Sequence, residues 1–504
     1  MAKKSNGQPA KINYFFKGGY IDLWNTIKGS FENFGDDLSD SWSEVVDNAE
    51  DFWDAFTEVV EDIISFDFDL IDWGDIGDSI ASMFKLCFYF CKFLCTLIIT
   101  TLVCVGLSAL HILILALIML GAYAIFGFLF VADSTYSLIN GISSNCGNCQ
   151  RHFVLPHYKC PSGGVIHTKL KPGRYGIWTR TCECGAKLPT TFLNGRDKLK
   201  AYCPFPSCGE EIEDGGKHVD LCIPIVGGTS SGKTCFITQA VTNVGNNVAA
   251  YGLEYRKYGG TNSDYEASKD IIDRKYTPDK TKESRLYYFR FYLTPKDRKV
   301  KNLVALCDVA GEIYSNDASL GGQIGYQYAN AFLLVVDPLS VVDYKRTLEN
   351  TPGVNVAKYG ASPERIDAVV GRLVGLLQNI FGIKAKKMLS TDVAVVFTKG
   401  DIPGLSDLIG ENAVKNYMIA NPGVSKYDAQ NAVCEKFLIE NGEANFINTV
   451  KTSFKSVQFF CSSALGHNQD GTDFVADGVE DPVLWLIDKA CSNIDLKDKW
   501  GRKI

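Results

Sequence analysis

The sequence predicts an α/β protein whose C-terminal part holds a mixed, mostly parallel sheet. Three observations support this prediction. Apolar strands alternate with helical segments from residue 217 onward, a long apolar run covers residues 86–131, and cysteines gather between Cys146 and Cys208. These features divide the chain into an acidic amphipathic helical region at 1–83, a transmembrane helical hairpin at 84–132, a zinc-ribbon module at 133–216 and the α/β domain at 217–504.

Composition excludes several classes of protein. The chain has 504 residues and a net charge of −7, so we expect two to four domains and no nucleic-acid partner. Its 17 cysteines are unevenly placed, which indicates a metal site and buried thiols rather than a disulfide framework. The basic N-terminus lacks an apolar stretch directly behind it, and no cleaved signal peptide is expected.

The N-terminal region is predicted to be helical and amphipathic. From Phe31 to Ile64 large apolar residues recur at helical spacing, and the opposite positions carry Glu and Asp. One or two helices that pack against a partner helix or the rest of the protein explain this pattern. Binding to the membrane surface is disfavoured because the polar face is acidic.

The apolar run at 86–131 contains one Lys, one His and no acid. One membrane span needs about 20 apolar residues, so a single straight helix would be roughly twice too long for a bilayer. We therefore expect a two-span hairpin that turns near Gly106-Leu107-Ser108, with a buried soluble hairpin or a re-entrant hairpin as alternatives. Lys85 and Lys92 near its start favour a cytoplasmic entry side. An even number of spans puts both soluble parts in one compartment, so we expect an integral membrane protein with its soluble domains in the cytoplasm.

A phosphate-binding loop is predicted where an apolar strand, Leu221–Val226, meets a helix. The loop has the pattern GxxxxGK[ST], in which backbone N–H groups and the helix N-terminus can cradle phosphates. Lys233 would reach the β- and γ-phosphates, and the Thr234 hydroxyl would bind Mg²⁺. The predicted phosphate-contacting residues are Gly227, Gly228, Thr229, Ser230, Ser231, Gly232, Lys233, Thr234 and Cys235. Pro224 is unusual in a central strand.

A second nucleotide element follows the strand that ends at Asp308, in the pattern DxxG. Asp308 can hold the hydration shell of Mg²⁺, and the Gly311 N–H can contact a γ-phosphate. The preceding strand, 286–293, is joined to this one by a short polar turn, which forces the two to pair antiparallel. The next core strand, Ala331–Asp337, carries no nucleotide motif of its own.

Two further strand ends predict a pocket for a guanine base. Thr398-Lys399-Gly400-Asp401 follows the strand at 393–397, and Asp401 would accept hydrogen bonds from the guanine N1–H and amine, a donor pair that adenine lacks. The Lys399 stem would pack on the base or ribose. Ser462-Ser463-Ala464-Leu465 follows the last strand, where the Ala464 N–H would meet the guanine O6; the residues predicted to contact the base are Thr398, Lys399, Asp401, Ser463, Ala464 and Leu465.

All of these motifs come in order, each at the C-terminal end of an apolar strand, where open α/β sheets bind ligands. Together they resemble the Ras-like, or TRAFAC, class of P-loop GTPases over residues 217–497. The resemblance implies a Ras-like P-loop NTPase fold, GTP or GDP with Mg²⁺ as ligands, and a switch threonine, for which Thr281 is our choice and Thr277 the alternative. The residues expected to act in catalysis are Lys233, Thr281, Gly311 and Glu312.

One position departs from that resemblance. The residue after DxxG is often Gln in Ras-like proteins and orients the attacking water, but here it is Glu312. Its negative charge beside the γ-phosphate predicts slow hydrolysis that needs a protein partner or activator.

The cysteine-rich module predicts two tetrahedral Zn²⁺ sites, which would supply its folding energy. One predicted site consists of Cys182, Cys184, Cys203 and Cys208, which look like a zinc ribbon, and the other of Cys146, Cys149, His157 and Cys160. A cross-braced pairing is an alternative, and His152 or His167 could replace His157. Such modules serve structure or partner docking.

An anchor, zinc ribbons and a Ras-like domain together resemble bacterial membrane-anchored proteins of the double-GTPase group. The resemblance implies a membrane-anchored protein that hydrolyses GTP slowly as a nucleotide-dependent switch. The alternatives are a GTP-binding scaffold with little turnover that recruits partners through its ribbons and helices, and an ATP-dependent protein. The oligomeric state is left open.

Overall fold

The structure is a computed structural model. It describes residues 9–64, 73–149, 151–259, 263–274, 276–278, 287–297, 300–308, 327–380, 382–384, 388–466 and 475–496. The chain forms two compact units. One consists of residues 1–134 and 170–196, and the other of residues 135–169 and 197–504.

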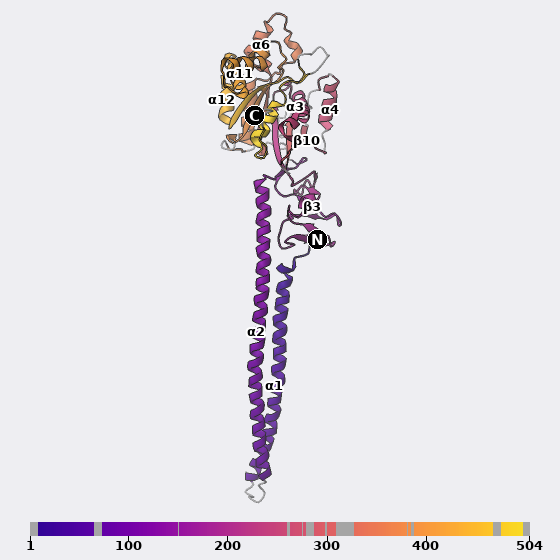
Figure 1. The fold of residues 1–504 in the computed structure, drawn as a ribbon, viewed down its shortest axis with the longest axis vertical. Coiled ribbons are helices and arrows are strands. Elements are labelled where there is room, and N and C mark those ends of the chain that lie inside the picture. Colours follow the sequence, from indigo (N-terminus) through magenta and orange to yellow (C-terminus); the bar gives the residue numbers. More distant parts are fainter. Residues whose placement is uncertain are drawn as a thin grey trace. The chain divides into compact units, whose positions relative to one another are not determined.

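Two long helices dominate the first unit. After the short η1 (Tyr14–Phe16), α1 (Gly18–Ile64) runs antiparallel beside α2 (Trp73–Ile139) (Figure 1). The rings of Trp42 and Phe93 lie 5.1 Å apart, and the Tyr20 and Tyr123 hydroxyls are 3.1 Å apart. The predicted amphipathic helix therefore exists, and it packs against a partner helix.

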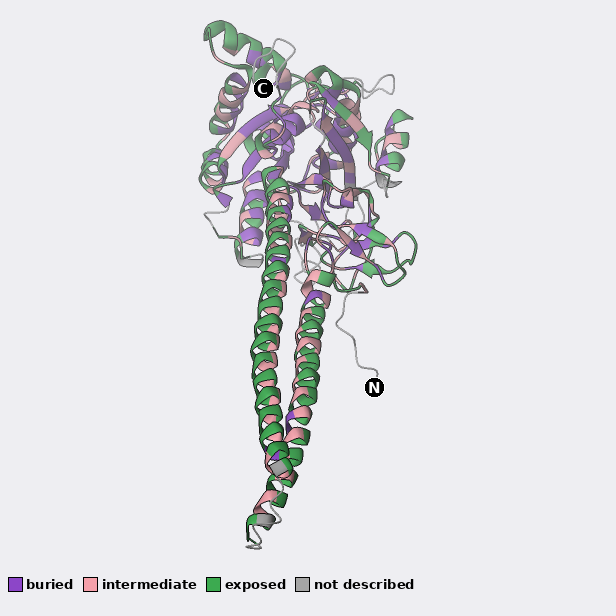
Figure 2. Ribbon diagram, turned by 60° about the horizontal axis from the view of Figure 1, so that its bottom comes forward, coloured by how far each residue is buried: buried purple, intermediate pink, exposed green. Residues whose placement is uncertain are grey.

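The predicted turn inside the apolar run is wrong, because α2 continues unbroken through Gly106-Leu107-Ser108. A lone glycine costs a helix only about 1 kcal/mol, and this stretch has no proline to stop it. The described residues hold one helix that is long and apolar enough to cross a membrane, Gly74–Ile139. Figure 2 shows its residues mostly as exposed.

A buried ion pair ties the rest of the first unit to α2. Arg196, at the start of η2 (Arg196–Lys198), donates to Asp133 Oδ2 at 2.8 Å and to the carbonyls of Leu170 and Thr190. The same region holds the two-stranded sheet of β5 (Thr179–Thr181) and β6 (Lys187–Pro189). Because both charged groups are buried, the guanidinium needs this full set of acceptors.

The second unit begins with two small sheets. β1 (Ser144–Asn145) pairs with β2 (His152–Phe153). A four-stranded sheet follows in the order β4 (Ile166–His167), β3 (His157–Lys159), β7 (Ala201–Tyr202) and β8 (Glu211–Ile212). These strands are only two or three residues long, which is typical of a module whose stability depends on metal.

The larger part of the second unit surrounds a seven-stranded sheet. Its order is β10 (Leu253–Lys257), β11 (Tyr287–Pro295), β12 (Lys301–Asp308), β9 (His218–Gly227), β13 (Ala331–Val336), β14 (Asp392–Phe397) and β15 (Ser456–Cys461). β10, β11 and β12 pair antiparallel, and the ladders from β12 to β15 are parallel. The mixed, mostly parallel sheet and the antiparallel β11 beside the Asp308 strand are confirmed.

Pro224 is accommodated in β9 because the ladder between β9 and β13 starts after it. Pairing between β9 and β13 begins at Ile225 opposite Leu333, one residue after the proline. The ladder with β13 therefore loses no bond at Pro224, which has no N–H to donate.

Helices cover both faces of this sheet, and Figure 2 shows the strands between them as buried. α3 (Lys233–Asn247) and α13 (Asp481–Ala490) pack on one face with one apolar core. α7 (Ile366–Gly375), α11 (Lys426–Glu440) and α12 (Ala444–Ser453) pack on the other. The remaining helical segments are η3 (Val248–Tyr251), α4 (Ser263–Asp273), η6 (Pro338–Ser340), α6 (Val342–Glu349), η7 (Val356–Tyr359), η8 (Leu376–Ile380), α9 (Leu405–Leu408) and α10 (Glu411–Ala420).

The segment between the predicted guanine motif and the last strand extends the core. Val433 and Phe437 of α11 and Phe446 of α12 are buried in the same apolar cluster as Phe397 of β14. Most of this extra helical segment is therefore bound into the fold of the domain.

Candidate functional site

The predicted phosphate loop joins β9 to α3, as its sequence requires. Two of its residues have left-handed backbone, Ser230 with φ of 62° and Gly232 with φ of 83°. A Cβ on Gly227 would lie 2.5 Å from the carbonyl oxygen of Val335, so only glycine fits there. The loop is thus held between the neighbouring strand and the start of α3.

Lys233 is folded back over this loop. Its ammonium donates to the carbonyl oxygens of Gly227 and Gly228 at 2.9 and 2.8 Å. Burial lowers the pKa of Lys233, and the nearby carboxylate of Asp308 opposes that shift. Within the described part of the chain the hydrogen bonds of this buried ammonium go to carbonyls, so an anion would add electrostatic stabilisation, which makes the position suited to a phosphate.

Two oxygen ligands suited to Mg²⁺ lie together next to the loop. The Thr234 hydroxyl donates to Asp308 Oδ2 at 3.3 Å, and the two residues come from α3 and the end of β12. Burial raises the pKa of Asp308, while Lys233 and Thr234 lower it. Among the described residues, Oδ1 of Asp308 has no hydrogen-bond partner although it is buried. A hydroxyl beside a buried, unsatisfied carboxylate oxygen fits a hydrated Mg²⁺.

The residues predicted to contact guanine come together around a cavity beside the phosphate loop. Asp401 Oδ1 accepts the Ser463 hydroxyl at 2.8 Å, and the Thr398 hydroxyl donates to the Ser231 carbonyl at 2.7 Å. The cavity has a volume of about 390 Å³, enough for a base and its ribose. The predicted residues that line it are Gly232, Cys235, Thr398, Lys399, Asp401, Ala464 and Leu465.

Asp337 is a residue that the sequence interpretation missed. This buried carboxylate at the end of β13 accepts the Lys399 ammonium at 2.6 Å and the Ser362 N–H at 2.7 Å on the same oxygen. Lys399 also donates to the Gly360 carbonyl at 2.9 Å. Asp337 therefore fixes the lysine of the guanine motif. An acid directly after an apolar core strand was the available signal, because ligand sites gather at such strand ends.

Glu364 is a second missed residue, and no pattern in the sequence marks it. Its Oε1 accepts both the backbone N–H of Thr229, at 2.9 Å, and the Thr229 hydroxyl, at 3.0 Å. A carboxylate from the segment before α7 is therefore bound directly to the phosphate loop.

The predicted catalytic residues fall partly outside the described part of the chain. Thr281, Gly311 and Glu312 lie outside the described residues. Thr277, the alternative switch threonine, is described and lines the same cavity as Asp401.

The sequence of this region matches a known family. Residues 221–458 match the model of the Double-GTPase 2 family. This part of the chain is similar to that family. The match runs from Leu221 in β9 to Gln458 in β15, so it includes the phosphate loop and the Thr398–Asp401 loop and ends before Ser462-Ser463-Ala464-Leu465. The matched region, called the Double-GTPase 2 domain below, is a GTPase-type domain. No curated protein matches the chain.

Two solved structures are also similar to the chain. Sup35 in complex with GDP is 13% identical over 51% of this chain and 39% of that one, with a TM-score of 0.21. The S. cerevisiae Ski7 GTPase-like domain bound to GTP is 14% identical over 55% of this chain and 51% of that one, with a TM-score of 0.26. The chain thus spans 39% and 51% of these two proteins, and at these TM-scores neither adds to the assignment.

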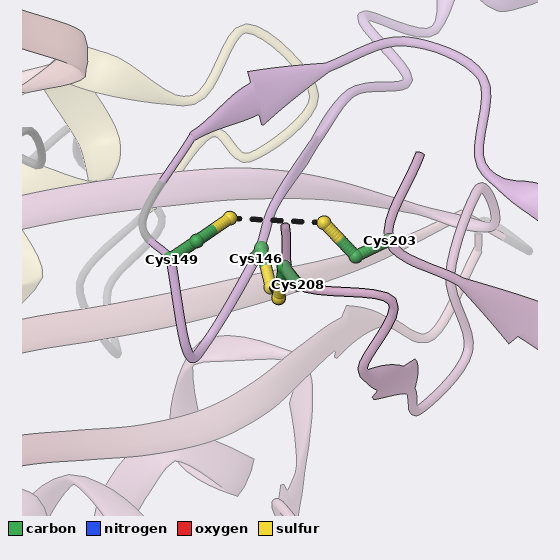
Figure 3. A group of neighbouring side chains, drawn as sticks. All are labelled: Cys146, Cys149, Cys203 and Cys208. Carbon is green, nitrogen blue, oxygen red and sulfur yellow. Dashed lines mark hydrogen bonds between the residues drawn. The ribbon is translucent and has the colours of Figure 1, made fainter. Parts of the chain in front are cut away.

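A four-cysteine centre lies ahead of the Double-GTPase 2 domain in the sequence. The sulfur atoms of Cys146, Cys149, Cys203 and Cys208 all lie within 4.8 Å of one another and point toward each other (Figure 3). The Cys146–Cys208 and Cys149–Cys203 sulfur distances are 3.5 and 3.7 Å. A tetrahedral Zn²⁺ with Zn–S bonds of about 2.3 Å would place its sulfurs about 3.8 Å apart. The residues present fit a zinc site.

This arrangement corrects the predicted partition of the ligands. Cys203 and Cys208 gather with Cys146 and Cys149, whereas Cys182 and Cys184 belong to the other compact unit. Spacing along the chain favoured neighbours in sequence, but an apolar cluster that includes Phe153 and Ile212 brings the two distant cysteine pairs together. The first and the last cysteine pairs of the module share this centre, which is neither the predicted partition nor a cross-braced one.

The remaining predicted ligands lie outside the four-cysteine centre. His157 begins β3, and burial lowers its pKa. Cys160 accepts the Gly163 N–H on its sulfur at 3.4 Å. Of the alternative histidines, His152 contacts Asn145 at 3.1 Å and His167 pairs with Tyr158 across β3 and β4. A second zinc site stays a prediction.

Proposed function

We propose that the protein is a membrane-associated GTP-binding protein that hydrolyses GTP slowly and acts as a nucleotide-dependent switch. The observation that carries the proposal is the contact between Asp401 and Ser463 at the wall of the 390 Å³ cavity. It presents a carboxylate at the point where a guanine base differs most from adenine. The Double-GTPase 2 match supports the same assignment.

Specificity for guanine follows from hydrogen bonding. The Asp401 carboxylate would accept from the guanine N1–H and amine, and adenine would leave the same buried oxygens unpaired. The Ser463 hydroxyl holds the carboxylate in place, and Asp337 holds the Lys399 stem against the base or ribose. These contacts hold both side chains in place, which reduces the ordering energy lost on binding.

The phosphate loop and the residues beside it would bind the phosphates of the nucleotide. Lys233 exchanges two carbonyl contacts for phosphate oxygens, which are stronger acceptors for a buried ammonium. Thr234 and Asp308 would hold Mg²⁺, which neutralises charge on the β- and γ-phosphates. The loop that follows Asp308 would report the presence of the γ-phosphate to a partner.

Slow turnover is inferred from the sequence after Asp308. A glutamate at position 312 places a negative charge where most Ras-like proteins have a neutral glutamine. We therefore propose that a partner supplies positive charge or positions the water for efficient hydrolysis.

Membrane association is proposed through α2 alone. Its apolar run is mostly exposed, and large side chains such as Leu102, Leu113 and Phe128 are more than half exposed. Exposure of so many apolar side chains is costly in water and favourable in lipid. The Double-GTPase 2 domain would face the cytoplasm, where GTP is available.

A GTP-binding scaffold with little turnover is the second candidate function. Glu312 favours it, and so does the four-cysteine centre, because zinc modules of this kind commonly dock partners. We propose that the centre binds Zn²⁺ for structure and takes no part in hydrolysis.

Nucleotide binding and turnover by the full chain in detergent test these proposals. Selective binding of GTP over ATP with slow phosphate release, both lost in Lys233→Ala, is the expected result. Tight GTP binding without release would favour the scaffold. Equal affinity for ATP would contradict the role given to Asp401.

A further inference from the structure

Glu364 holds the phosphate loop from outside the nucleotide cavity. One carboxylate oxygen accepts two hydrogen bonds from a single residue, Thr229, which is the third residue of the loop. The backbone N–H of Thr229 therefore faces a side-chain carboxylate. In a loop of this type, N–H groups usually face phosphate oxygens.

The contact is tightly packed on the loop side. A Cβ added to Gly228 would lie 2.6 Å from the Ser362 hydroxyl and 3.3 Å from the Glu364 Cβ. The segment before α7 therefore packs directly against Gly228 of the loop, and the Glu364 carboxylate has little room to move. Glu364 is a fixed charge rather than a loose surface acid.

Its carboxylate pairs with a cation among the described residues. Arg372 of α7 forms an ion pair with the other carboxylate oxygen, Oε2 of Glu364. The two side chains differ in exposure, at 42% for Arg372 and 19% for Glu364. Solvent therefore screens the arginine more strongly than it screens the carboxylate.

The same segment also reaches the guanine end of the site. The Glu364 N–H donates to the Ser362 hydroxyl at 3.4 Å, and the Ser362 N–H donates to Asp337 at 2.7 Å. Asp337 in turn holds Lys399. The segment is thus bound to both ends of the nucleotide site, which keeps Glu364 in register with the loop.

Like charges repel, and GTP brings more negative charge to the loop than GDP does. A carboxylate bound to the loop backbone would lie close to phosphates held by that loop, where a unit charge acts through a medium of lower effective dielectric than water. The repulsion is larger for the nucleotide with the additional phosphoryl group. Neutralisation of Glu364 by Arg372 reduces it.

We propose that Glu364 and Arg372 together set the preference of this site for GTP over GDP. The proposal rests on the guanine-nucleotide binding proposed above. Glu364 lowers the affinity for GTP relative to GDP, and Arg372 limits that effect. The pair is a specificity-determining element that takes no part in the chemical step.

Affinities of the full chain for GDP and for a non-hydrolysable GTP analogue, both with Mg²⁺, test the proposal. Glu364→Gln keeps an oxygen that can accept both Thr229 bonds and removes the charge. It should shift the affinity ratio toward the GTP analogue by roughly three- to tenfold, and Arg372→Gln should shift it the other way by a similar factor. Both shifts should shrink at high salt.

Arg346→Gln is the matched control, because Arg346 pairs with Asp343 on the exposed face of α6. It should leave the ratio unchanged. An unchanged ratio in Glu364→Gln, or an equal loss of affinity for both nucleotides, would overturn the proposal and leave guanine-nucleotide binding intact. Absence of guanine-nucleotide binding by the unmodified protein would overturn the proposed function as well.

Discussion

The hydroxyl of Ser463 donates a hydrogen bond to the Asp401 carboxylate at 2.8 Å. The two residues follow different strands, β14 and β15, and a second bond joins their loops, from the Gly400 N–H to the Ser462 carbonyl at 2.9 Å. The Ser463 hydroxyl also accepts the Gly466 N–H at 2.9 Å. One side chain thus orders the loop expected to meet guanine O6 and aims the carboxylate expected to meet N1–H.

Ser463→Ala should weaken binding of GDP without changing the choice of base. Loss of one hydrogen bond to a buried carboxylate should raise the Kd for GDP about five- to tenfold. Fluorescence titration with labelled nucleotides measures it. Ser462→Ala is the matched control, because the Ser462 hydroxyl has no hydrogen-bond partner in the described structure. An equal effect of both substitutions would contradict the positioning role.

Asp401→Asn should exchange the preferred base. The asparagine amide can donate, so it no longer matches the guanine amine but does match the carbonyl that xanthine has at that position. GDP affinity should fall at least a hundredfold, in line with the loss of a paired buried polar contact, and xanthosine diphosphate should bind better than GDP. Retained GDP selectivity in this variant would exclude Asp401 from base recognition.

Asp337→Ala should destabilise the domain as well as weaken binding. It leaves the ammonium of Lys399, whose side chain is only 13% exposed, without its charge partner. Loss of one member of a buried pair costs about 3 kcal/mol, whereas Asp343→Ala in the exposed pair with Arg346 should cost less than about 1 kcal/mol. Thermal unfolding with and without GDP separates the two contributions.

The sequence was sufficient to predict the strand-end loops of the nucleotide site. Each motif occupies the first residues after an apolar strand, and parallel strands bring those ends to one edge of the sheet. Asp337 and Glu364 were missed for different reasons. Asp337 has the right position but belongs to no motif, and Glu364 reaches the loop only because the segment before α7 packs on Gly228. Contacts of that kind depend on tertiary packing.

The two errors in the N-terminal half share a cause. Hydropathy and spacing describe local tendencies, so they suggested a turn near Gly106 and a zinc site from cysteines close in sequence. In the structure, α2 pairs with α1 along its length and does not fold on itself, and the Cys146 pair joins the Cys203 pair across small sheets. The amphipathic pattern of α1 indicated a packing partner, but no local pattern identified α2 as that partner or joined the two distant cysteine pairs.

Cys203→Ser should remove one zinc ion from the protein and lower the stability of the cysteine-rich module. Burial raises the pKa of the Cys146 thiol to about 11, so a Cys146 thiolate needs a bound cation at neutral pH. Acid competes with the metal for the sulfurs, and zinc should be released as the pH falls. Metal analysis after dialysis at pH 7.5 and pH 5 measures both effects.

Cys91→Ser is the control for that experiment, because Cys91 is an exposed thiol on α2. It should leave the zinc content unchanged. A zinc content that is the same in Cys203→Ser and in the unmodified protein would remove the four-cysteine centre as a metal site.

Charges introduced on α2 should abolish membrane association. Leu113 and Leu117 lie one helical turn apart in the apolar run, and both are exposed. A lysine at the centre of a bilayer costs about 2.5–3.5 kcal/mol, so Leu113→Lys with Leu117→Lys should move the full chain from floating vesicles to the aqueous fraction. Leu138→Lys, near the end of α2 and outside the apolar run, should still float.

α1 carries many carboxylates along α2, so the side of α2 that faces lipid must be the one that α1 leaves exposed. Flotation of the double variant equal to that of Leu138→Lys would show that α2 does not enter the lipid, and the exposed run would then have to be covered by protein.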